Sequence, residues 1–111
     1  CAIVRKKLSA RYQLIERNEQ LVWYVRKIAA KFSLDGLFNV QFRDGADGRP
    51  YLLEINPRMS GGIPYTFATG VNLPYWAILI ALGRANRHQV PVPRTGVVVD
   101  TSLWRTVATS L

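Results

Sequence analysis

The chain has 111 residues, 49% of them hydrophobic and 20% charged, and no apolar run approaches the roughly 20 residues that cross a bilayer, so we expect one domain at most and no membrane contact. Its formal net charge of +8 does not indicate a nucleic-acid-binding protein, because the basic residues are spread over many segments instead of clustering on one helix or aromatic platform. The single cysteine, Cys1, excludes an intramolecular disulfide, and without a visible signal peptide we expect a cytoplasmic location.

The first strand-like segment covers residues 2–8 and is basic. Side chains two apart on a strand point the same way, so Arg5 and Lys7 face together while Lys6 faces away. Such a segment is typical of an edge strand whose charges prevent sheet-to-sheet aggregation. The chain begins with Cys1 and runs straight into this strand, so we expect residues 1–111 to be a single partial domain cut from a larger protein.

An amphipathic helix follows, capped by Asn18 and running to about Leu34, with Gly36 as its stop. Its apolar residues recur at helical spacing and predict a buried stripe of Leu21, Val25, Ile28, Ala29 and Phe32. The opposite positions are expected toward solvent; they are Trp23, Arg26, Lys27 and Lys31. We expect this helix to lie against the sheet formed by the strands that follow it.

Two apolar runs, residues 38–42 and 52–56, predict a β-hairpin. The segment between them carries two Asp-Gly pairs, which are strong reverse-turn signals. A turn centred on the second pair places Gln41 directly opposite Glu54. Pro50 cannot donate to the ladder, so the loop is expected to be longer than two residues.

Polar side chains gather on one face of this hairpin. Strand alternation puts Asn39 with Gln41, and Glu54 with Asn56. Carboxylate and amide oxygens suit Mg²⁺, which keeps several waters and takes one or two carboxylates together with phosphate oxygens of a substrate. Arg58 follows at once and has the planar fork that binds a phosphoryl oxygen in bidentate fashion. The alternative is that Gln41, Glu54 and Asn56 form only the hydrated face of a hairpin.

Residues 59–62, Met-Ser-Gly-Gly, predict a flexible connection to a short helix over residues 64–69 that stops at Gly70. Two interpretations of the connection stay open. Its glycines either allow backbone amides to approach an anion closely or only supply the positive φ that a plain connection needs.

A third helix begins after Asn72, its cap, and ends at Gly83. It is apolar on nearly every side, so we expect it to pack in the core, with contact to another subunit as the alternative. Residues 84–95 predict a loop, and residues 96–107 predict strands that return to the sheet.

The chain resembles the ATP-grasp superfamily through three motifs in order, which are residues 36–42, 52–62 and 68–74. The likeness covers roughly residues 20 to 83 and is greatest to the ATP-binding domain of the carbamoyl-phosphate synthase and biotin carboxylase type. It implies an α+β fold, an antiparallel β-sheet with helices packed on one face, which forms the C-terminal half of an ATP-grasp domain.

The resemblance also implies a site. Gln41, Glu54 and Asn56 would coordinate the Mg²⁺ ions, or Mn²⁺, that bridge the phosphates of ATP. Arg58 would be catalytic and bind ATP, stabilising the phosphoryl group in transfer, and Arg5 and Lys7 would lie near the phosphates or the substrate. ATP is a polyanion, and its binding together with an acidic partner lobe accounts for the net charge of +8.

The implied function is the Mg²⁺-ATP-binding portion of a ligase that joins a small carboxylate to an amine or a thiol through an acylphosphate. The chain has no glycine-rich phosphate flap, no upstream lysine strand and no adenine hinge. We therefore expect it to be inactive alone and to need the remaining ATP-grasp lobe of its parent chain. The alternative function is a non-catalytic interaction or oligomerisation module that keeps the scaffold, and a homo-oligomer stays open.

Overall fold

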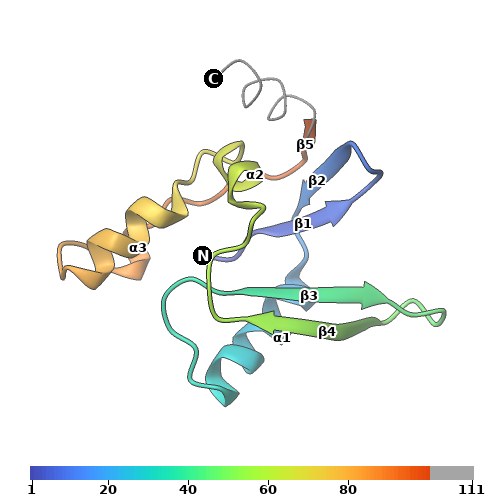
Figure 1. Ribbon diagram of the computed structural model, residues 1–111, viewed down its shortest axis with the longest axis horizontal. Helices are drawn as coiled ribbons and strands as arrows, with labels where there is room; N and C mark the ends of the chain where they lie inside the picture. Colours follow the sequence, from blue (N-terminus) through green and yellow to red (C-terminus); the bar gives the residue numbers. More distant parts are fainter. Residues whose placement is uncertain (101–111) are drawn as a thin grey trace.

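The computed structural model describes residues 1–100, which form an α+β arrangement of two antiparallel sheets and three α-helices (Figure 1). In chain order the elements are β1 (Val4–Lys7), β2 (Tyr12–Glu16), α1 (Glu19–Lys31), β3 (Asn39–Asp44), β4 (Pro50–Asn56), α2 (Ile63–Phe67), α3 (Leu73–Ala81), the 3-10 helix η1 (Arg87–Gln89) and β5 (Val97–Asp100). The predicted fold class is confirmed. The strands form two sheets where the sequence predicted one.

The first sheet has the order β1-β2-β5, so β1 is an edge strand within residues 1–100. Its central strand β2 was not predicted. It pairs with β1 on one side and with β5 on the other, so β5 returns to β2 and not to the hairpin. The predicted strand over residues 103–107 lies outside the described residues. The buried core includes Ile15 and Val99, which belong to this sheet, and Val71, which precedes α3 in the chain.

The second sheet is the β3–β4 hairpin, and its register is as predicted, with Gln41 directly opposite Glu54. The loop is longer than two residues, also as predicted, since the strand pairing ends at Asp44 and Pro50. Within the loop, Gly45 N–H donates to the carbonyl of Arg49 at 2.8 Å. Beyond Gln41 the pairing shifts by one residue, which leaves Leu53 as the extra residue of a β-bulge.

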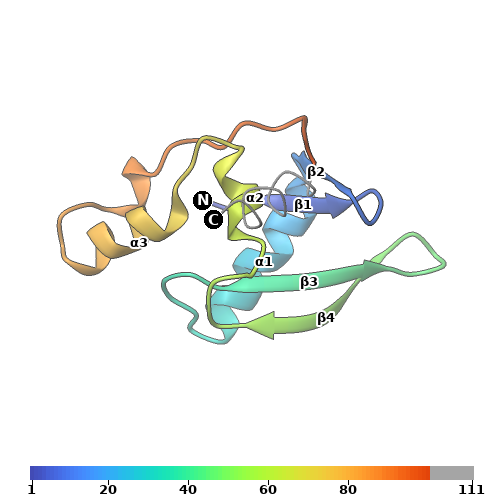
Figure 2. The ribbon, with the colours of Figure 1, turned by 45° about the horizontal axis from the view of Figure 1, so that its top comes forward.

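The first helix, α1, lies against the hairpin in both views (Figures 1 and 2), and the rings of Tyr24 and Phe42 are 6.3 Å apart. Its cap is as predicted, since Asn18 Oδ1 accepts a hydrogen bond from Leu21 N–H at 3.0 Å. The predicted end near Leu34 is wrong: α1 ends at Lys31, because Ser33 turns the chain with a φ of 51°. The predicted buried stripe is only half-buried, since no residue of α1 is fully buried, and Phe32 lies beyond the helix and is 55% exposed.

The prediction that α3 packs in the core is wrong. None of its residues is buried, and Ile78 is 60% exposed. Figures 1 and 2 both show α3 extending away from the two sheets. Its predicted cap is confirmed, with Asn72 Oδ1 accepting from Tyr75 N–H at 3.1 Å. The segment predicted as a loop after α3 contains η1, which begins after a third asparagine cap, Asn86.

None of the helices described in residues 1–100 has both the length and the apolar composition needed to cross a bilayer.

Candidate functional site

The polar face of the hairpin brings the predicted metal-ligating residues together. Gln41 is paired with Glu54, and Asn39 is paired with Asn56. Residues directly opposite each other in an antiparallel pair lie on the same face, with Cβ atoms about 4.5–5.5 Å apart. Gln41 and Glu54 are exposed and Asn56 is half-buried, so the face is open to solvent.

A hydrogen bond fixes one of these side chains. Asn56 Nδ2 donates to Asn39 Oδ1 at 3.2 Å, which leaves Asn56 Oδ1 oriented to accept other bonds. Asn39 Nδ2 in turn donates to the carbonyl of Arg58 at 3.2 Å. Asn39 was not predicted as a site residue, although its alternation with Gln41 placed it on this face. It connects the strand face to the segment that carries the arginine.

Arg58 lies just beyond the end of β4 and is exposed. Its Nη1 donates to the carbonyl of the next residue, Met59, at 2.9 Å. The guanidinium thus lies beside the end of the strand, held by the backbone of the residue that follows it. A phosphate group that bound it would replace that carbonyl as the acceptor.

The donor set fits a hard divalent cation that takes most of its ligands from elsewhere. Within residues 1–100, no three His, Cys, Asp or Glu side chains gather to hold a metal ion. Glu54 supplies one carboxylate, and Gln41 and Asn56 supply amide oxygens. Mg²⁺ commonly uses one or two carboxylates and completes its shell with water and substrate phosphates, so this face suits Mg²⁺ carried by a nucleotide better than a stand-alone metal site.

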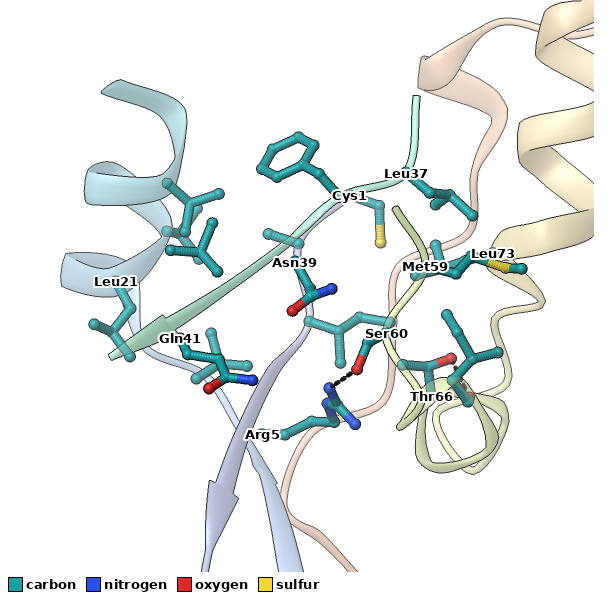
Figure 3. Close-up of a pocket in the computed structure, with 18 of the residues that line it drawn as sticks. Cys1, Arg5, Leu21, Leu37, Asn39, Gln41, Met59, Ser60, Thr66 and Leu73 are labelled. Atoms are coloured by element: carbon teal, nitrogen blue, oxygen red, sulfur yellow. Dashed lines mark hydrogen bonds between the residues drawn. The ribbon is translucent and has the colours of Figure 1, made fainter. Parts of the chain in front are cut away.

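A second group of polar residues surrounds Arg5 on β1 (Figure 3). Arg5 Nη2 donates to Ser60 Oγ at 2.8 Å. The guanidinium carbon of Arg5 lies 5.8 Å from the centre of the Tyr65 ring. Ser60 Oγ also accepts from Gly62 N–H at 3.0 Å. A Cβ built on Gly62 would overlap Arg5 Nη1, so only glycine leaves room for the guanidinium there.

Burial lowers the pKa of Arg5, because removal from water disfavours the charged form, and the nearby Tyr65 opposes this effect. In the part of the chain that the structure describes, Arg5 forms no ion pair. The half-buried guanidinium therefore has hydrogen-bond donors to spare and no carboxylate to neutralise it.

Arg5 lines a cavity of about 560 Å³ (Figure 3). Residues of β1, α1, β3 and the segment around residues 59–63 also line it. Lys7 lines it too and Lys6 does not, which confirms the predicted common face of Arg5 and Lys7. Gln41 reaches the same cavity from the hairpin. The other predicted site residues, Glu54, Asn56 and Arg58, do not line it.

Comparisons with known proteins agree on one family. A family model described as "ATP-grasp in the biosynthetic pathway with Ter operon" matches residues 1–102. The chain is 36% identical over 77 residues to the carbamoyl phosphate synthase large chain of Rhodopirellula baltica, covering 62% of this chain and 7% of that protein. The arginine-specific large chain of Geobacillus stearothermophilus is 37% identical over 71 residues, covering 63% of this chain and 7% of that protein.

A third relative, the carbamoyl phosphate synthase large chain of Agathobacter rectalis, is 36% identical over 84 residues, which is 75% of this chain and 8% of that protein. The chain thus spans less than a tenth of the length of these curated relatives. No solved structure matches it.

Proposed function

The chain belongs to the ATP-grasp family, and on this premise we propose that it is the Mg²⁺-ATP-binding portion of an ATP-dependent ligase, which joins a small carboxylate to an amine or a thiol through an acylphosphate. The observation that carries the proposal is the hairpin register, which sets Gln41 opposite Glu54 and Asn56 on the same polar face, with Arg58 two residues further along the chain.

In this proposal the chain's own residues position Mg²⁺ and the phosphates and offset the charge of the phosphates. Glu54, Gln41 and Asn56 present oxygens to Mg²⁺, or to Mn²⁺, and Arg58 exchanges its bond to the carbonyl of Met59 for one to the γ-phosphoryl group. Bound Mg²⁺ would supply positive charge that offsets the charge of the phosphates. Phosphoryl transfer needs positioning and charge compensation more than covalent help, which is what such side chains provide.

The reaction has two steps. An oxygen of the substrate carboxylate attacks the γ-phosphorus of ATP, the bond from that phosphorus to the bridging oxygen breaks, and ADP leaves. The amine or thiol then attacks the carbonyl carbon of the acylphosphate, inorganic phosphate leaves, and the proton of the nucleophile passes to solvent. The adenine contacts and the phosphate flap would come from the remaining lobe of a longer parent protein.

A second candidate function is an interaction or oligomerisation module without catalysis. The observation that favours it is the exposed apolar surface of α3, where Tyr75, Ile78 and Leu82 are 52%, 60% and 61% exposed. Apolar surface of this kind marks contact with further protein surface. The same surface is also compatible with the ligase, because a second lobe or a second copy would cover it.

Glu54→Gln in the full-length protein tests the proposal. Removing the carboxylate should lower ATP-dependent ADP release about a hundredfold or more, since metal-assisted charge stabilisation is worth several kcal/mol. Asp35→Asn, the equivalent change at an exposed carboxylate outside the hairpin, is the control and should leave the rate unchanged. An unchanged rate in Glu54→Gln, or a wild-type protein that does not bind Mg²⁺-ATP in a calorimetric titration, would contradict the ligase and favour the interaction module.

A further inference from the structure

Polar and apolar side chains both line the cavity next to Arg5. The polar ones include Arg5, Lys7, Gln13, Asn39, Gln41 and Ser60. Apolar side chains from α1, from β3 and from the start of α2 and α3 line it as well, among them Leu21, Val25, Phe38, Met59, Ile63 and Leu73. Its volume of about 560 Å³ falls within the range of small-molecule sites, which is about 300–1,000 Å³.

The surroundings of Arg5 leave its guanidinium able to hold an anion. Ser60 accepts one hydrogen bond from Arg5, the ring of Tyr65 lies near its guanidinium, and Gly62 leaves space for it. A guanidinium has five N–H donors, so most of those of Arg5 stay available to a ligand. Its charge is half-buried and has no acidic partner within residues 1–100, and an anion would remove that imbalance.

The apolar walls show which anion fits. The triphosphate of ATP is strongly hydrated, and burying it against aliphatic side chains would forfeit that hydration without replacement. Of the hairpin residues proposed for Mg²⁺-ATP, Gln41 lines the cavity, while Glu54, Asn56 and Arg58 do not. A carboxylate with an apolar body matches both kinds of lining, because a guanidinium pairs with a carboxylate in bidentate geometry and the apolar side chains cover the rest.

We propose that this cavity binds the acceptor substrate, a small monocarboxylic acid with an apolar body. Its carboxylate pairs with Arg5 beside Gln41, where the γ-phosphate of ATP would arrive, and its apolar part lies between α1 and the start of α2. Ser60 and Tyr65 are positioning residues for Arg5. The assignment rests on the proposed ligase function and narrows its substrate class.

Calorimetric titration of the full-length protein with acetate, hexanoate and 1-hexanol tests the cavity. We expect hexanoate to bind more tightly than acetate, by about fourfold for each methylene that becomes buried. Hexanol should bind at least tenfold more weakly than hexanoate, because it has no charge for Arg5. Equal binding of acetate and hexanoate, or of hexanol and hexanoate, would overturn the proposal.

Variants of β1 identify the residue responsible. Arg5→Met keeps much of the side-chain length without the charge and should abolish the preference for hexanoate over hexanol, whereas Arg5→Lys should retain part of it. Lys6→Met is the matched control on the neighbouring exposed position and should behave as the wild type. A thermal unfolding midpoint measured for each variant shows whether it is folded, and the comparison is made among folded variants.

Titration with Mg²⁺-ATP separates this proposal from the previous one. Arg5→Met should lose hexanoate and keep Mg²⁺-ATP, and Glu54→Gln should do the reverse. If Arg5→Met weakens both ligands equally, Arg5 serves the phosphates and the carboxylate assignment is wrong. A wild-type protein that binds hexanoate through Arg5 but not Mg²⁺-ATP would support the cavity assignment while contradicting the ligase.

Discussion

Asn56 donates a hydrogen bond from Nδ2 to Oδ1 of Asn39 at 3.2 Å, straight across the two strands of the hairpin. This contact decides which end of the Asn56 amide points away from its neighbour, and it is the oxygen that an Mg²⁺ ion would need. Because Asn39 also holds the carbonyl of Arg58, one side chain couples the orientation of two proposed site residues.

Asn39→Ala should therefore weaken Mg²⁺ binding without removing a ligand. Loss of an outer partner of a metal ligand typically costs about tenfold to a hundredfold in metal affinity. The Mg²⁺ concentration that gives half-maximal ATP binding measures it. Asn39→Asp keeps an oxygen to accept from Asn56 and should lose less than the alanine variant; equal losses would show that the hydrogen bond does not orient Asn56.

Gly62→Ala should disturb ligand binding more than stability. The added Cβ would overlap the end of the flexible Arg5 side chain, which can move aside at a cost of about 1 kcal/mol or less, but the guanidinium then leaves Ser60. Gly61→Ala is the matched control, because a Cβ there meets nothing within 4 Å. We expect hexanoate affinity to fall in the first variant alone. Equal affinities in the two variants would contradict the role of Gly62.

Asn18→Ala should lower the stability of the fold by about 1 kcal/mol, because Asn18 Oδ1 caps α1 by accepting from Leu21 N–H. Chemical denaturation followed by circular dichroism measures the change in the free energy of unfolding. Gln20→Ala, an exposed position inside the first turn, should be close to neutral or slightly stabilising. A cap variant as stable as the wild type would mean that α1 gains nothing from this bond.

Asp47 should make the hairpin loop sensitive to acid. The N–H of Arg49 and then the hydroxyl of Tyr51 donate to its carboxylate and lower its pKa. The folded-state pKa thus lies below the unfolded value of about 3.9, so the stabilisation is present above about pH 4 and is lost as the pH falls through the folded-state pKa. Wild type should melt higher than Asp47→Asn at pH 6, with the difference shrinking toward pH 2.

Tyr51→Phe removes one of the two donors and should show a smaller version of the same pH dependence. A melting difference between wild type and Asp47→Asn that stays constant from pH 6 to pH 2 would contradict this account.

The features that the sequence predicted correctly are local ones. The Asn18 and Asn72 caps and the register of Gln41 with Glu54 each depend on residues close in sequence, where side-chain capping and Asp-Gly turns act directly. The common face of Arg5 and Lys7 follows in the same way from strand alternation.

The features that were missed depend on distant partners. β2 contains two neighbouring apolar residues, Leu14 and Ile15, so it lacks the alternation that marks a strand. Its second partner, β5, lies more than 80 residues away in the chain. The exposure of α3 could not be predicted either. An apolar helix is expected to be buried, but its sequence does not show which other element or chain packs against it. The positioning role of Ser60 required knowing that β1 approaches the segment after β4.

The bulge at Leu53 has a last consequence for the hairpin. Asn39 to Gln41 pair with Asn56 to Glu54 in one register. Phe42 pairs with Leu52 in a register shifted by one residue, so Leu53 has no partner on β3. A version of β4 shortened by this one leucine would keep both halves in step and leave Glu54 facing Gln41. Length in this strand is thus free to vary by a residue while the chemistry at its end stays in place.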